Sequence, residues 1–264
     1  MNIQFKNNQL TVFQSSLYMT TSTVIQTNSS IIVVDPTWLP DEVEGIRNYV
    51  YRIKKDRQIH LIFTHSDWDH ILGVGAFPDA KIIGSKELSE HDQKEKIINQ
   101  IKEFDDLNYL SRHYPVYYPQ VHVEIEGDRQ QLIIDELVLT FYKAPGHTAD
   151  GLFTVIEPYG IFVAGDYLSD VEFPFIYSGF KDYLQTIHKS RKIVSDHDIH
   201  VLIPGHGNVT TSKDEINQRI QESIDYLENL KKNIDQEVYL KKRYRFYNGM
   251  KSTHANNKKW VNNC

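Results

Sequence analysis

Short apolar runs occur in two groups along the chain, and stretches with helical spacing follow each group. Short apolar runs bounded by turn residues are typical of buried strands. The predicted strands are 10–13, 16–25, 30–34, 59–63 and 81–84 in the first group, and 121–125, 131–134, 137–142, 152–156, 161–163 and 201–203 in the second. This grouping favours an α+β sandwich over a strictly alternating α/β sheet.

Apolar residues three and four positions apart predict helices over 41–54, 85–113 (with breaks), 183–194, from 212 onward, and 238–247. Asp41 and Ser212 are the predicted N-caps, with Glu215 as the capping-box partner of Ser212. The polar residues 251–264 are expected to fray. No linker or short repeat interrupts the chain, so we expect one domain over 1–264, with a helical C-terminal extension from about residue 212.

The composition narrows the class of protein. The chain has 264 residues, 40% of them hydrophobic, which is enough for a large core. Its net charge of −6 argues against nucleic-acid binding. No apolar run approaches the length of a membrane span and no signal peptide is evident, so we expect a soluble, cytoplasmic protein. The one cysteine, Cys264, excludes an intrachain disulfide and an all-cysteine metal site.

The candidate chemistry begins directly after the predicted strand 59–63. His65, Asp67, Asp69 and His70 lie within six residues of one another. Two imidazoles and two carboxylates cannot pack together in a dry site without a positive charge between them. The cluster therefore predicts a metal site, and the alternative is a polar loop that water solvates.

Three later turns have the same form, a strand followed by a ligand-type side chain beside glycine. They carry His147 in 144–148, Asp166 in 164–166 and His206 in 204–207. Glycine lets the backbone turn sharply and approach its neighbours closely. Each turn alone is more typical of a structural role, but their joint occurrence at strand ends predicts one shared site.

Together these motifs resemble the metallo-β-lactamase-fold superfamily over roughly residues 10–210. That family's pattern is His-x-His-x-Asp-His, a His in a Gly-His-Thr turn, an Asp after Gly, and a His in Pro-Gly-His-Gly. The resemblance implies a four-layer αβ/βα sandwich, here with additional C-terminal helices, and a binuclear metal site on one rim.

Matching positions imply the role of each residue. The first metal would be held by His65, Asp67 and His147, and the second by Asp69, His70 and His206, with Asp166 bridging both. A hydroxide between the metals is the expected nucleophile, and Asp69 and Asp166 are the expected catalytic carboxylates. Asp35, which follows the predicted strand 30–34, would either orient a ligand imidazole or cap a turn.

Asp67 departs from the family, which usually has histidine there. Three carboxylates facing two divalent ions leave a formal charge of about +1, and this oxygen-rich set moves metal preference from zinc toward iron or manganese. The resemblance extends here to the iron-binding flavodiiron branch. The expected cofactors are two divalent transition metals (zinc, iron or manganese). The alternative is that Asp67 is not a ligand and the first site is weak or empty.

Trp68, in the loop that carries the first ligands, and Tyr177 are the candidate substrate contacts. Two aromatic regions, 105–118 and 167–181, could supply the wall of a pocket, and the alternative is that their side chains pack against a core. We expect other histidines to lie outside the site, namely His60, His91, His188, His197 and His200. The leading hypothesis is a metal-dependent hydrolase of a small-molecule ester, lactone, thioester or phosphodiester, acting as a monomer or homodimer without nucleic-acid or membrane partners. The alternatives are an iron-dependent oxidative enzyme (a dioxygenase or flavodiiron-like chemistry) and a catalytically silent metal- or ligand-binding protein.

Overall fold

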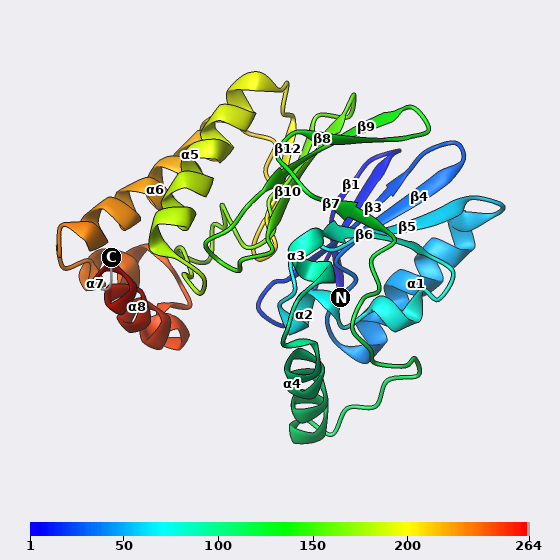
Figure 1. Cartoon of the computed structure of the whole chain (residues 1–264), viewed down its shortest axis with the longest axis horizontal. Helices are drawn as coiled ribbons and strands as arrows, with labels where there is room; N and C mark the ends of the chain where they lie inside the picture. Colours follow the sequence, from blue (N-terminus) through cyan, green and yellow to red (C-terminus); the bar gives the residue numbers. More distant parts are fainter. Residues whose placement is uncertain (263–264) are drawn as a thin grey trace.

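Two β-sheets face each other, and helices cover both of their outer faces (Figure 1). The computed structural model describes residues 1–262. The seven-stranded sheet has the order β1-β2-β3-β4-β5-β6-β7 and the five-stranded sheet the order β12-β11-β10-β9-β8. Their bounds are β1 Asn2–Lys6, β2 Leu10–Gln14, β3 Thr21–Gln26, β4 Ser30–Val34, β5 Gln58–Ile62, β6 Lys81–Ser85, β7 Val123–Ile125, β8 Gln130–Ile134, β9 Leu137–Lys143, β10 Leu152–Glu157, β11 Ile161–Val163 and β12 Val201–Ile203.

Both sheets are mixed. Strands β1 to β4 pair antiparallel, whereas β4 to β7 pair parallel. In the second sheet, β8 to β11 pair antiparallel and β11 pairs parallel with β12. Because parallel neighbours end at the same edge, the loops after β4 and β5, and those after β11 and β12, emerge side by side.

Eight α-helices are described, with one 3-10 turn, Val74–Ala76. The helices are α1 Pro40–Lys54, α2 Trp68–Ile71, α3 Lys86–Ser89, α4 Lys94–Leu107, α5 Phe180–Asp196, α6 Lys213–Lys231, α7 Glu237–Arg243 and α8 Tyr247–Asn262. None of them is long and apolar enough to cross a bilayer.

Three apolar clusters correspond to the three interfaces between four layers. The central cluster joins the inner faces of the sheets and contains Ile32, Ile62, Leu139, Ile156 and Ile203. A second lies under α1 and α4, and a third lies under α5, α6 and α8. The structure thus has the expected αβ/βα sandwich with additional C-terminal helices.

The expectation that residues 251–264 fray is wrong for the part that the structure describes, because α8 continues to Asn262. Its residues Met250, His254 and Asn257 are buried against the third cluster or beside it. A polar helix can be held in this way when a few side chains on one face find buried partners. Cys264 lies outside the described residues.

Smaller differences have local causes. The strand expected from residue 16 begins at Thr21, because the preceding residues turn, with Tyr18 at a φ of 51°. Leu39, not Asp41, is the N-cap of α1. Ser212 does cap α6, since its hydroxyl accepts from the Glu215 amide at 3.3 Å. The helical stretch 85–113 is divided into α3 and α4, and β1 was not anticipated.

Candidate metal centre

The ends of strands from both sheets meet at one rim, where the seven candidate ligands lie together. His65 and Asp67 follow β5, and Asp69 and His70 lie in α2 directly afterwards. The other three follow strands of the second sheet: His147 after β9, Asp166 after β11 and His206 after β12. They form two groups, and within each group the donor atoms lie within 4.8 Å of one another. The groups are His65-Asp67-His147-Asp166 and Asp69-His70-His206.

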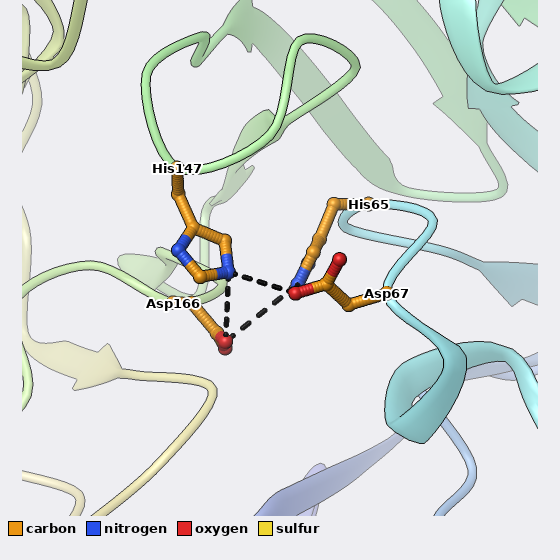
Figure 2. A group of neighbouring side chains, drawn as sticks. All are labelled: His65, Asp67, His147 and Asp166. Atoms are coloured by element: carbon orange, nitrogen blue, oxygen red, sulfur yellow. Dashed lines mark hydrogen bonds and ion pairs between the residues drawn. The ribbon is translucent and has the colours of Figure 1, made fainter. Parts of the chain in front are cut away.

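In the first group, four side chains from three loops point toward one another (Figure 2). The Nε2 atom of His147 lies 3.1 Å from Oδ2 of Asp67 and 3.2 Å from Oδ2 of Asp166. The Nε2 atom of His65 lies 3.6 Å from the Asp166 oxygen and 3.8 Å from that of Asp67. Asp67 therefore lies among the donors, at the position where the family usually has histidine.

The second group adjoins the first through Asp166. Its Oδ1 lies 3.1 Å from Nε2 of His70, and its Oδ2 lies 3.2 Å from Nε2 of His206. Oδ2 of Asp69 lies 3.5 Å from both of these nitrogens. Asp166 thus contacts imidazoles of both groups, as a bridging ligand must.

Hydrogen bonds at Nδ1 fix the direction of all four imidazoles. Each Nδ1 lies within 3.0 Å of a protein oxygen, the partners being Thr64 Oγ1 for His65, Asp35 Oδ2 for His70, Phe175 O for His147 and Tyr18 O for His206. Because each Nδ1 is bonded to a protein oxygen, each Nε2 faces the centre and is the nitrogen available for a metal ion.

Asp35, the residue directly after β4, supports this arrangement, and β4 is the strand beside β5. Its buried carboxylate accepts from the Thr64 amide at 2.9 Å, from the Thr64 hydroxyl at 2.5 Å and from His70 Nδ1 at 3.0 Å. Asp35 therefore orients a ligand imidazole, and it also holds the turn that carries His65.

Two glycines permit the close approach of these turns. A Cβ atom on Gly205 would lie 2.1 Å from Oδ1 of Asp166, so any side chain there would displace the shared carboxylate. Gly146 has a φ of 126°, and a Cβ atom would lie 2.4 Å from the backbone nitrogen of Tyr183. Only glycine fits at either position.

The electrostatics of the cluster favour bound cations. Burial lowers the pKa of His206, but Asp166 and Glu172 outweigh that effect and raise it to about 10. Burial also lowers the pKa values of His70 and His147. The neighbouring carboxylates raise them by more than burial lowers them, so both pKa values lie well above the usual range. Divalent ions would replace these protons. The buried Nε2 of His65 has no hydrogen-bond partner, and a mixed set of imidazoles and carboxylates suits zinc, iron or manganese.

A cavity of about 690 Å³ lies over both groups. One part of its wall is formed by Tyr18, Trp38 and Trp68, and the rings of the two tryptophans pack edge to face with their centres 4.9 Å apart. Phe175 and Tyr177 form another part of the wall. The two expected substrate contacts, Trp68 and Tyr177, thus border the cavity.

Other expectations about the cavity differ from the structure. The aromatic residues of 105–118 are not among its lining residues, and Tyr109 is 96% exposed at the end of α4. Tyr18, Trp38 and Glu172 were missed, because nothing in their own sequence context marks a site. His91, which was expected to take no part in the site, is among the residues that line the cavity.

The fold and the paired His/Asp groups define a metal-binding αβ/βα sandwich. The sequence matches the model of the metallo-beta-lactamase superfamily over residues 16–206, and the chain belongs to this superfamily.

Solved structures with this fold share little sequence with the chain. A sec-alkylsulfatase from Pseudomonas sp. is 14% identical with a TM-score of 0.71, the match covering 90% of this chain but only 43% of the other. A metallo-beta-lactamase family protein from Thermus thermophilus is 16% identical with a TM-score of 0.64, and the match covers 86% of this chain and 82% of the other. An archaeal metallo-beta-lactamase superfamily protein from Sulfolobus tokodaii is 14% identical with a TM-score of 0.58, and the match covers 82% of this chain and 86% of the other. At these identities the similarity shows the fold alone.

Proposed function

We propose that this protein is a binuclear metal-dependent hydrolase of a small-molecule ester, lactone, thioester or phosphodiester. The observation that carries the proposal is the convergence of seven imidazole and carboxylate side chains, five of which line a cavity of about 690 Å³. A cavity of this size accommodates one small molecule.

The chain's own groups account for the positioning of the reaction. His65, Asp67 and His147 would hold one ion, Asp69, His70 and His206 the other, and Asp166 both. Such an ion pair supplies Lewis acidity and brings the pKa of water toward neutrality. We assign Asp69 and Asp166 direct roles in catalysis. The Asp69 carboxylate lies between the imidazoles of the second group, and the Asp166 carboxylate lies between the imidazoles of both groups.

The cavity walls favour a substrate with an apolar part. Trp38 and Trp68 offer ring surface, and Tyr177 stands with its ring centre 5.1 Å from that of His147. Burial and the Asp67 carboxylate raise the pKa of Tyr177, so its hydroxyl stays protonated and can donate to a carbonyl or a developing oxyanion.

The charges beside the metal groups favour carboxylic esters, lactones and thioesters over phosphodiesters. Lys96, on the exposed face of α4, is the one lysine or arginine among the described lining residues. Glu172 adds a carboxylate near His206, and no described residue forms a hydrogen bond or ion pair with its side chain. Phosphate groups are usually held by arginine or lysine, and an added carboxylate repels them.

Oxidative chemistry is the second candidate, favoured by Asp67. Its oxygen lies 3.1 Å from His147 Nε2, so the first group offers two nitrogens and two oxygens, a harder donor set than three imidazoles. A silent binding protein is the third candidate, and a demonstration of turnover removes it.

The test uses protein purified without chelators and reconstituted separately with zinc, manganese or iron(II). Metal content, oxygen uptake and hydrolysis of matched carboxylic ester, lactone, thioester and phosphodiester substrates are then measured. We expect two metals per chain and ester hydrolysis that Asp166→Asn abolishes. Asp150→Asn, a buried aspartate outside both metal groups, serves as the control and should retain hydrolysis. Iron-dependent oxygen uptake without hydrolysis would instead support the second candidate, and bound metal with neither activity would support the third.

A further inference from the structure

The segment 173–178 lies between the turn that carries His147 and the C-terminal helix α8. It is tied to the turn by several backbone bonds. The Tyr177 amide donates to the carbonyl oxygens of Gly146 and His147, and the Ser178 amide donates to Gly146 as well. The carbonyl of Phe175 accepts from His147 Nδ1 at 2.9 Å. The position of this segment therefore sets the direction of a candidate metal ligand.

On its other side, the segment is held by one side chain of α8. Asn257 is 0% exposed. Its Oδ1 accepts from the Ile176 amide at 3.1 Å, and its Nδ2 donates to the Pro174 carbonyl at 2.6 Å. The Ile176 N–H belongs to the same peptide unit as the Phe175 carbonyl, and the Pro174 carbonyl belongs to the unit before it. The Asn257 amide therefore fixes the peptide unit that His147 contacts and the unit preceding it.

The chemistry of the asparagine amide suits this position. One planar group presents an acceptor and a donor side by side, which matches an N–H and a C=O two residues apart on a single segment. Nδ2 also donates to the Tyr226 hydroxyl at 2.9 Å, which ties the amide to α6 and holds its orientation.

We propose that Asn257 is a positioning residue for the metal ligand His147. Through it, α8 supports the metal centre although the helix lies beyond residues 16–206, which the family model matches. The inference rests on the metal centre of the proposed function and on no particular substrate. Losing the clamp frees the Phe175 carbonyl to move and the imidazole to rotate, which weakens binding in the first group.

The experiment compares Asn257→Asp and Asn257→Leu with the control Tyr226→Phe. Asn257→Asp keeps the acceptor for Ile176 but places a carboxylate oxygen against the Pro174 carbonyl. Asn257→Leu removes both bonds. Tyr226→Phe removes a bond to the same amide from the same helix interface but leaves both bonds to the segment. All three are made in the full chain, and thermal unfolding of the metal-free proteins reports their stability.

The main readout is cobalt(II) titration against a competing chelator, followed by the visible spectrum of bound cobalt. We expect both Asn257 variants to bind one of two equivalents roughly 10- to 100-fold more weakly, with a changed spectrum. Tyr226→Phe should bind both equivalents within about twofold of the parent, even if its thermal stability falls. A role in stability alone would move unfolding and leave the affinity and the spectrum unchanged, and that result overturns the inference.

Hydrogen exchange in the parent gives a readout that needs no variant. Because coupling between two sites is reciprocal, metal binding should slow exchange of the Ile176 amide. Unchanged exchange there overturns the inference even if the Asn257 variants do not fold. A parent that binds two metals but hydrolyses nothing refutes the proposed hydrolase and leaves the role of Asn257 in place. A parent that binds no metal refutes both.

Discussion

Replacing Asp35 by asparagine should destabilise the protein far more than the same change at Asp150. The two aspartates are a matched pair, 3% and 2% exposed. Asp35 accepts three hydrogen bonds, from the amide and hydroxyl of Thr64 and from His70 Nδ1. Neither carboxylate oxygen of Asp150 has a hydrogen-bond partner among the described residues. Asparagine suits the left-handed backbone of Asp35, at a φ of 44°, so the comparison isolates the carboxylate.

The magnitude follows from the bonds. A bond to a charged group contributes about 1.5–3 kcal/mol and a neutral one about 0.5–1.5 kcal/mol, so three weakened bonds cost about 3 kcal/mol. The new amide nitrogen must also face a donor, since every partner of Asp35 donates. At Asp150 the change removes a buried carboxyl group whose oxygens have no hydrogen-bond partner among the described residues, so stability should stay equal or rise by about 1 kcal/mol.

Urea unfolding of the metal-free variants measures both changes, and a metal titration measures the effect on His70. Asp35→Asn should also weaken metal binding roughly 10- to 100-fold, because His70 loses its charged partner. The reasoning is refuted if Asp35→Asn unfolds at the parent's urea concentration, or if Asp150→Asn loses as much stability as Asp35→Asn.

Three further predictions concern the metals and the cavity. Asp67→His should shift the metal content of protein purified from one medium toward zinc; an unchanged metal ratio by elemental analysis would argue against ligation by Asp67. Metal affinity should rise with pH across neutrality and binding should release protons, because the raised pKa of His206, about 10, keeps that imidazole protonated in metal-free protein. Calorimetry in buffers of different ionisation enthalpy counts these protons, and a count of zero contradicts the electrostatics. Because folding raises the pKa of His206 from 6.5 to about 10, protonated His206 stabilises the metal-free folded protein. This stabilisation is complete below pH 6.5 and is lost as the pH rises through about 10. Finally, Glu172→Gln should raise kcat/KM for anionic relative to cationic esters by roughly tenfold; equal ratios in the two proteins would show that Glu172 does not face the substrate.

The sequence alone predicted most of the strands and the seven side chains that the structure brings together in two groups. Apolar runs marked almost every strand, because a strand buried on both faces must be apolar throughout. The glycine-flanked turns marked His147, Asp166 and His206, because close backbone approach excludes a side chain. Such signals are local, so they survive in a single sequence without any knowledge of the partner segments.

Only the tertiary structure decided what surrounds the site. Tyr18 and Trp38 border the cavity from segments that carry no candidate metal ligand, and their contacts depend on how the two sheets face each other. Asn257 lies in a segment too polar to be expected as ordered, yet it clamps residues 174 and 176 from more than 80 positions away. A hydrogen bond between such distant residues leaves no periodic trace in sequence, since it needs one side chain at one place and no pattern around it.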